Sequence, residues 1–368
     1  MVRLRLIFII ITICLVSYAY PGNAKRTKPL VWDMSELSLM KQEGVNNHEV
    51  ALVLKQANEV CKRSSISVVY KSKSFAPDNH YYCSVGPYWW PNPEGGDKYI
   101  NRDGIVNPES KNYDSEKLVE LRNNLKLLSQ AFYFTKQKQY YNAFVEQLTI
   151  WFLDSSTRMY PTFAYAQVIP GHNNNMGRST GMIDAYSFNT IIESIRLVNC
   201  TKRIKRKTML ALKDWFHQFA LDSEERYGDV FREADNNISL AYDVTMANLL
   251  LFSEDFSRAR EIIDGFYERR ICKQINEVGQ QPAELSRTKA FTYSLYNLSH
   301  ILDFCVLVKS IYPNYFNDYG ERIEIAFAFL SQYIEDPQIF PYQQITDWKE
   351  CIREYNEQSY RVRKLQNQ

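Results

Sequence analysis

Several common signatures are missing from this sequence of 368 residues. No cysteine pair has the C-x-x-C spacing, and no group of Cys and His has the spacing of a zinc site. The 44 Lys+Arg and 42 Asp+Glu are scattered, so no basic tract for nucleic acid is present. Phosphate-binding loops, the G-x-G-x-x-G turn and the G-x-S-x-G elbow are absent too. We therefore expect no metal, no cofactor and no nucleic-acid partner.

Long apolar runs are also absent, except for one from Leu6 to Val16 that follows Arg3 and Arg5. Small residues come next, so residues 1–24 are predicted to be a signal peptide, too short to span a bilayer comfortably. We expect export to the periplasm, with no membrane association after cleavage. An exported chain allows one or two disulfides, although six scattered cysteines are more typical of buried thiols. The cysteines left after cleavage are Cys61, Cys83, Cys200, Cys272, Cys305 and Cys351.

What the chain does contain is apolar and aromatic. Hydrophobic residues make up 45% and charged residues 23%, which excludes disorder for most of the chain. The 26 Tyr and 6 Trp exceed what a helical core needs. Because these side chains combine a flat apolar face with a hydrogen-bonding edge, they are typical of sugar-binding clefts.

Apolar residues recur at helical spacing through most of the chain, and the only strand candidate is Ile66–Tyr70. We predict one all-α domain over residues 25–368, made of helical hairpins packed in a ring or superhelix, with a short extension after about residue 340. The predicted helices are 35–62, 115–137, 139–153, 182–198, 206–221, 238–252, 256–270, 290–311 and 321–335.

Three irregular segments interrupt the helices, at 76–113, 159–181 and 275–289. Long irregular loops in a compact domain are usually functional. All three are therefore candidates to border one cleft.

These irregular segments carry motifs that resemble a known family. Residues 80–91, HYYCSVGPYWWP, look like the H-x-Y-x-S-x-x-P-Y-W-W-P signature of the alginate lyase domain family, and residues 102–109, RDGIVNPE, look like its continuation. Similar blocks keep their order and spacing from about residue 30 to 310. They are WFLD to TRM at 151–159, YAQVIPG at 165–171, GRSTGMID at 177–184, and ELSRT with YSL at 284–295.

The resemblance implies an α/α toroid, an incomplete barrel of helical hairpins, that cleaves polyuronic acids by elimination. In family members a Tyr acts as base and acid with the help of an Arg. Tyr293 and Arg287 occupy these two positions. A nearby Arg⁺ would lower the pKa of a Tyr from about 10. Asn236 and Asn237 match the first two letters of the family's N-N-H segment, so Asn237 is expected to help neutralise the substrate carboxylate. Taken alone, Tyr293 is equally typical of a half-buried helix tyrosine.

One position departs from the family pattern. Ile238 stands where the family His belongs, and Thr292 replaces a second His just before the Tyr. An Ile side chain has no lone pair or charge, so it neither accepts a proton nor neutralises a carboxylate. The enzyme then either works with Tyr293 as base and acid in turn on polymannuronate or glucuronan, or has become a degenerate relative that binds acidic oligosaccharides without cleaving them.

Another histidine could replace the missing imidazole. His172 lies in the polar loop segment GHNNN, and we hypothesise that it supplies this group; the alternative is an exposed loop histidine. His217 and His300 fall within predicted helices and His48 on the surface. His80 is interpreted as a cleft residue or a structural one.

Candidate substrate-binding residues come from the loops and from the N-N segment. Two prolines flank the Tyr-Trp-Trp run and exclude regular helix there, which leaves its rings for sugar stacking or for filling the interior. The guanidinium of Arg178 matches carboxylate geometry. The predicted set is His80, Tyr88, Trp89, Trp90, Gln167, Asn173, Arg178 and Asn236. A glycoside hydrolase is a formal alternative, because it needs a carboxylate pair that two of Asp229, Glu233, Asp235 and Asp243 would supply.

Overall fold

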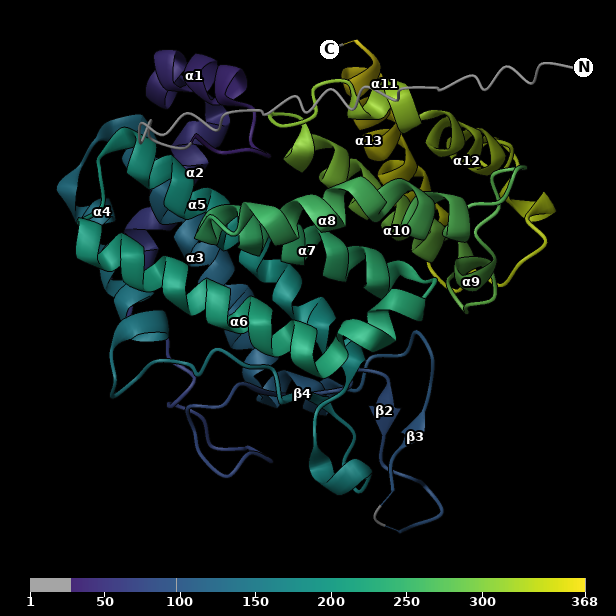
Figure 1. Ribbon diagram of the computed structural model, residues 1–368, viewed down its shortest axis with the longest axis horizontal. Helices are drawn as coiled ribbons and strands as arrows, with labels where there is room; N and C mark the ends of the chain where they lie inside the picture. Colours follow the sequence, from purple (N-terminus) through teal and green to yellow (C-terminus); the bar gives the residue numbers. More distant parts are fainter. Residues whose placement is uncertain (1–27, 97, 368) are drawn as a thin grey trace, which may run out of the picture.

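The computed structural model describes residues 28–96 and 98–367, and Figure 1 shows its arrangement. The predicted signal peptide and its cleavage site lie outside these residues. The α-helices are α1 (Met34–Glu43), α2 (His48–Val60), α3 (Asp114–Thr135), α4 (Lys138–Leu148), α5 (Ser187–Thr201), α6 (Arg206–Glu233), α7 (Asn237–Ser253), α8 (Phe256–Phe266), α9 (Pro282–Leu285), α10 (Ala290–Val308), α11 (Tyr315–Tyr319), α12 (Glu321–Ser331) and α13 (Trp348–Gln366).

Short 3-10 and π-helical turns join or extend these helices. They are η1 (Gly44–Asn46), η2 (Pro108–Asn112), η3 (Thr149–Leu153), η4 (Asn173–Asn175), η5 (Ser179–Tyr186), η6 (Tyr267–Cys272) and η7 (Pro337–Ile339), of which η3 and η6 are π-helical. They account for several differences from the predicted helices. For example, the predicted helix over 35–62 is two helices separated by η1, where Gly44 has a φ of 59° that ends α1. Helix α6, in contrast, continues to Glu233, past the predicted end at 221.

The helices form the predicted α/α toroid. Helices α3, α5, α7 and α10 pack against one another in that order and make the inner wall. Helices α2 and α4 cover α3, helices α6 and α8 cover α7, and α13 covers α10. The strands and the two irregular segments that carry them, 76–113 and 159–181, lie at the lower edge of Figure 1, whereas α9, in the third irregular segment, lies at its right side.

Helix α7 is the centre of the hydrophobic core. Fourteen of its 17 residues are buried, because it is apolar on almost every side rather than amphipathic. Tyr242, Met246 and Leu249 pack into a cluster with α3 to α6, whereas Leu240, Val244 and Ala247 pack into a second cluster with α8 to α13. The two halves of the toroid therefore share this one helix.

The strand prediction was wrong. Residues 66–70 form no strand, because the side-chain amide of Gln147 takes both backbone hydrogen bonds of Ile66, at 2.9 and 2.8 Å. Instead β1 (Cys83–Val85) pairs in parallel with β4 (Tyr165–Val168), and β2 (Trp89–Trp90) pairs antiparallel with β3 (Ile100–Asn101). The β1–β4 pair ties the first two irregular segments together, and the β2–β3 pair lies within the first of them.

The C-terminal segment is more than the predicted short extension. Helix α13 packs along α10 and buries Cys351, Val362 and Leu365, so it completes the outer layer. In the described part of the chain the six cysteines form no disulfide. No helix within that part is long and apolar enough to cross a membrane.

His300 is buried in α10 between the rings of Tyr186 and Tyr296, at centroid distances of 4.5 and 4.3 Å. Burial lowers the pKa of His300 to about 4 from its ordinary 6.5; nearby Asp303 opposes this shift and Arg361 adds to it. The unfolded chain therefore binds a proton between these two pH values that the folded chain does not. Acid should destabilise the fold by up to about 3 kcal/mol over this interval.

We predict that His300→Leu flattens the fall in stability between pH 6.5 and 4, measured as the free energy of unfolding in urea. His217→Gln is the matched control, because His217 is partly exposed and bonds Asp255 at 3.1 Å. Equal slopes for His300→Leu and the parent protein would contradict the assignment.

Candidate active site

Tyr293 lies in the first turn of α10, and its ring is held on two sides. Its hydroxyl donates a hydrogen bond to the Tyr88 hydroxyl at 2.8 Å. The guanidinium carbon of Arg287 lies 4.0 Å from the centre of its ring. The structure thus brings together two predicted catalytic residues and Tyr88, which come from α10, the turn after α9 and the loop before β2.

Asp103 holds Arg287 in this position. Its two carboxylate oxygens accept from Arg287 Nη2 and Nε at 2.6 and 3.2 Å, and it also accepts from the backbone and hydroxyl of Thr288. Gly104 makes this approach possible, since a Cβ there would lie 2.6 Å from Thr288 Oγ1 and its φ is 75°. The ion pair therefore ties the RDG loop to the start of α10.

The electrostatics of Tyr293 differ from the expectation. Burial, and then the hydrogen bond to Tyr88, raise the pKa of the Tyr293 phenol well above its ordinary value. Arg287 does favour the phenolate, as predicted, but its effect is smaller. Partial burial works against ionised Asp103, yet the hydrogen bonds from Arg287 and Thr288 lower the pKa of this carboxyl below its usual range.

Asn237 is joined to this cluster through Glu284. Its backbone N–H and its side-chain Nδ2 donate to Glu284 Oε1 and Oε2, each at 2.7 Å. Burial raises the pKa of Glu284, although these two hydrogen bonds and the charge of Arg287 favour its ionised form. One N–H of the Asn237 amide remains for another acceptor.

Asn236 has a structural role that the sequence did not reveal. Its side chain accepts from the backbone N–H groups of Ile238 and Ser239 and so caps the N-terminus of α7. The half-buried Ile238 packs against the core cluster formed with α3 to α6. Ile238 follows Asn237 directly at the start of α7, so it lies next to the polar group of Asn237, Glu284 and Arg287.

Trp89 and His172 form a second group on the loops. Trp89 lies between Arg178, whose guanidinium carbon is 5.7 Å from its ring centre, and His172, at a ring distance of 5.5 Å. His172 Nε2 also lies 3.2 Å from the Tyr99 carbonyl oxygen. The structure therefore places His172 beside Trp89 and the β2–β3 connection, whereas Tyr293 contacts Tyr88.

Gln167 and Arg178 are tied to a buried carboxylate. Arg178 donates to the backbone and side-chain oxygens of Gln167 at 3.0 and 3.3 Å. Gln167 in turn donates to Asp184, which also accepts from Tyr82 and Ser84. Burial raises the pKa of Asp184. The Gln167 side chain is therefore committed to holding Arg178 and the loop.

The other predicted binding residues occupy the loop surface. Trp90 donates to the Ile105 carbonyl at 2.9 Å and lies under the Arg102 guanidinium. Asn173 is exposed in η4, in a left-handed conformation with a φ of 44°. His80 lies in a different group, with Nδ1 2.6 Å from the Arg158 carbonyl and its ring stacked on Tyr160.

Two of the four carboxylates considered for a hydrolase are Asp243 and Asp229. Asp243 bonds Arg270 with both oxygens, at 2.9 and 3.0 Å, and Arg269 at 2.9 Å. Asp229 is fully exposed and pairs with Arg232. A carboxylate neutralised by two arginines is not available as a general acid. Within the described chain, no group of His, Cys, Asp and Glu is arranged to hold a metal ion.

Sequence reasoning missed four members of the site. Asp103 lies in the RDG block and Glu284 in the ELSRT block, so their presence in these motifs could have indicated them. Asp184 stands in the GRSTGMID block in the same way. Tyr296, one turn after Tyr293, had no such signal; burial raises its pKa, and nearby Asp303 and Tyr88 add to this shift.

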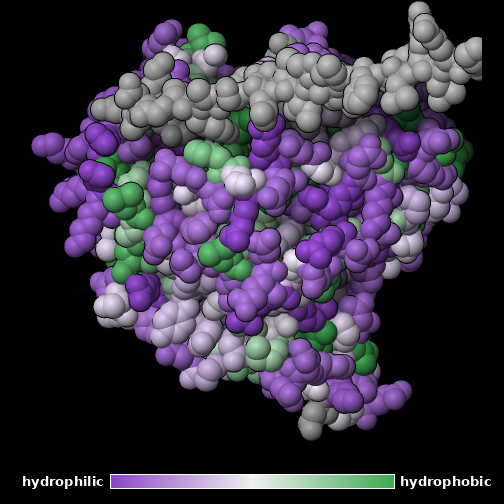
Figure 2. Space-filling model, viewed as in Figure 1, coloured by the Kyte–Doolittle hydropathy of each residue, from purple (hydrophilic) through white to green (hydrophobic). Residues whose placement is uncertain are grey.

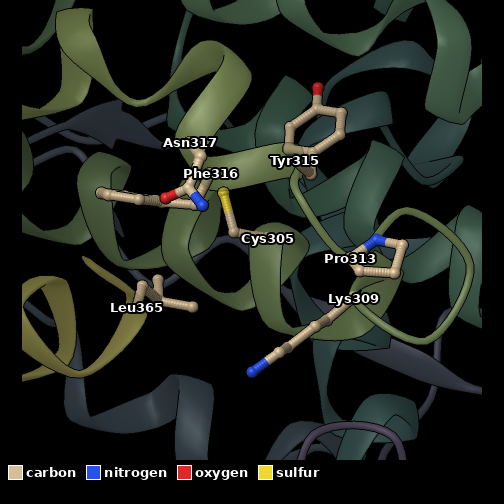
Figure 3. Close-up of a pocket in the computed structure, with 7 residues that line it drawn as sticks. All are labelled: Cys305, Lys309, Pro313, Tyr315, Phe316, Asn317 and Leu365. Atoms are coloured by element: carbon tan, nitrogen blue, oxygen red, sulfur yellow. The ribbon is translucent and has the colours of Figure 1, made fainter. Parts of the chain in front are cut away.

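A small cavity elsewhere in the molecule contrasts with this site. Figure 3 shows it around the sulfur of Cys305, with lining side chains from α10, α11 and the end of α13. Its volume of about 10 Å³ holds roughly one water. Such a cavity is a packing defect and not a ligand site.

A family model and solved structures match this chain to different degrees. The alginate lyase family model matches residues 65–340. A crystal structure of an alginate lyase from Bacteroides ovatus is 33% identical, with 92% of each chain covered and a TM-score of 0.85. Alginate lyase A1-III from Sphingomonas species A1 is 13% identical over 78% of each chain, with a TM-score of 0.46. A search of curated proteins finds no match.

The α/α toroid and its relatives define the class of this protein as a polysaccharide lyase. The chain belongs to the alginate lyase family. The family model matches three quarters of the chain, and the Bacteroides ovatus relative covers nearly all of the chain.

We predict that Asp103→Asn lowers kcat/KM on the cleaved polysaccharide by a factor on the order of 10–100, because Arg287 loses the charged partner that orients it over Tyr293. Asp255→Asn is the matched control: Asp255 is similarly exposed and paired with His217, and Asn still caps α8. Unchanged kcat/KM for Asp103→Asn would show that Arg287 does not depend on it.

Proposed function

We propose that this protein cleaves a β-1,4-linked polyuronic acid, polymannuronate or glucuronan, by β-elimination with Tyr293 as base and acid. The observation that carries the proposal is the position of Tyr293, with its ring under the Arg287 guanidinium and its hydroxyl on Tyr88. The Bacteroides ovatus relative is described as an alginate lyase, which supports a uronate substrate.

The elimination needs a base, an acid and a group that neutralises the substrate carboxylate. The Tyr293 phenolate takes the proton from C5 of the uronate; the C5 electron pair forms the C4=C5 double bond as the C4–O4 bond breaks. The phenol then returns the proton to O4 of the leaving sugar. Two groups neutralise the substrate carboxylate and so acidify the C5 proton. They are Arg287 Nη1, which does not bond Asp103, and the N–H of the Asn237 amide that does not bond Glu284.

Stereochemistry selects the substrate. In mannuronate and glucuronate the C5 proton and O4 lie on the same face of the ring, so one tyrosine serves both. In guluronate they lie on opposite faces, and a second group is needed. Tyr293 has Tyr88 and Arg287 as its direct partners, which favours the first two sugars.

A second candidate function follows from Ile238. If the family His is required, the loops and Arg178 would still bind an acidic oligosaccharide without cleaving it. Loss of one acid–base group costs on the order of 10²–10⁴ in rate. His172 would restore an imidazole only if the loop carried it from Trp89 toward Tyr293.

We further propose that the protein acts in the periplasm after removal of residues 1–24.

The deciding experiment follows the ultraviolet absorbance of the unsaturated uronate product. The mature protein is incubated with polymannuronate, glucuronan and polyguluronate, beside Tyr293→Phe and His172→Ala. We expect product from the first two polymers, none with Tyr293→Phe, and full activity with His172→Ala. Calorimetric binding with no product from any polymer would establish the binding function instead.

We also predict an alkaline pH profile. Because burial raises the pKa of the Tyr293 phenol, the phenolate fraction should grow about tenfold with each pH unit. Accordingly, kcat/KM, which reports the free enzyme, should rise with a slope near one up to about pH 9. A plateau below about pH 8 would mean that another group is the base.

A further inference from the structure

A larger cavity lies outside the active site, between the outer helices α6 and α8 and above the inner helix α7. Its volume is about 190 Å³, and the turn η6 closes one side. Roughly a dozen waters would fill it, or one sugar ring. Tyr293, Arg287 and Asn237 are not among its lining residues.

One tyrosine hydroxyl that faces this cavity has no hydrogen-bond partner among the described residues. Tyr242 is only 6% exposed, with its ring stacked on Phe231 at 4.2 Å. Among the described residues its hydroxyl makes no hydrogen bond, although the residue lines the cavity. The hydroxyl is not one of the buried polar atoms that lack a partner, so solvent reaches it and a ligand's oxygen could bond it in place of water.

Two arginines at this cavity also retain donors. Arg269 bonds Asp243 through Nε and Nη2, and its Nη1 lies where a Cβ on Gly265 would be 2.8 Å away. Glycine at this helical position therefore leaves room for the guanidinium. The exposed Arg258 makes only long ion pairs with Glu224 and Asp255, both at 3.8 Å.

The acidic residues in the lining narrow the ligand class. Glu224 and Glu261 can accept hydrogen bonds from hydroxyl groups, whereas Asp243 is already neutralised by Arg269 and Arg270. Met246 and Ile262 provide apolar contact. Arginine donors, carboxylate acceptors, a tyrosine hydroxyl and an apolar floor suit a polyhydroxylated ring with a single carboxylate.

The surrounding surface agrees with a sugar ligand. Figure 2, in the view in which α6 and α8 face the reader, shows a mainly hydrophilic surface with apolar atoms in small separate patches. A protein partner or a membrane would need a larger apolar area. The cavity is also smaller than the roughly 300–1,000 Å³ of pockets for drug-sized ligands.

We propose that this cavity is a second carbohydrate site that binds one uronic acid residue, as a free monosaccharide or at a chain end. Arg258 and Arg269 hold its carboxylate, the Tyr242 hydroxyl bonds a ring hydroxyl, and Glu224 and Glu261 accept from others. The choice of a uronate rests on the proposed function, whereas the cavity and its donors do not. The site would retain the enzyme on its polymer or bind its product.

The test is calorimetric titration of the mature protein with D-glucuronate, and with D-glucose as the uncharged control. We expect a Kd near millimolar for glucuronate, and binding about tenfold weaker in Tyr242→Phe and in Arg258→Gln. Tyr293→Phe should bind glucuronate as the parent does, and Tyr242→Phe should keep the parent lyase activity or polymer binding.

Equal glucuronate affinity in the parent, Tyr242→Phe and Arg258→Gln would overturn the proposal, as would a loss confined to Tyr293→Phe, which would place the ligand in the active site. Equal affinity for glucose would overturn the assigned role of the arginines. Since these readouts do not depend on cleavage, failure of the lyase proposal is seen separately in the product assay.

Discussion

The burial of α7 on every side is the constraint on which the rest of this structure depends. A helix with 14 of 17 residues buried has no face to leave in water, so other helices must cover it all round. Helices α5 and α10 flank it in the inner wall, and α6 and α8 cover it from outside. The toroid meets this requirement, because it places α7 between two helices of the inner wall and beneath two outer helices.

The N-terminus of α7 is where this apolar constraint gives way to polar chemistry. Asn236 satisfies the first backbone donors, and Asn237 delivers two hydrogen bonds to Glu284. That carboxylate is buried and belongs to α9, so α9 is fixed relative to the start of α7. Asp103 then fixes Arg287 from the loop side. The site is thus assembled from three distant segments, each held by a charged or polar contact of short length.

A buried phenol has two opposing consequences for catalysis. Its raised pKa makes the phenolate a stronger base, but fewer molecules carry it at neutral pH. Arg287 partly offsets this cost. Its guanidinium lies over the Tyr293 ring, and Asp103 holds it there.

The sequence by itself determined the helical class and the segments that carry the family motifs, because helical periodicity and local motifs are encoded over short stretches. It also predicted that Tyr293 and Arg287 belong together. Only the tertiary structure decided that Asp103 orients Arg287, that Asn236 is a cap, that His172 lies on Trp89 and that Asp243 is neutralised by arginines. These depend on contacts between segments far apart in the chain, and the raised pKa of Tyr293 depends on burial. Neither property is visible in the spacing of residues.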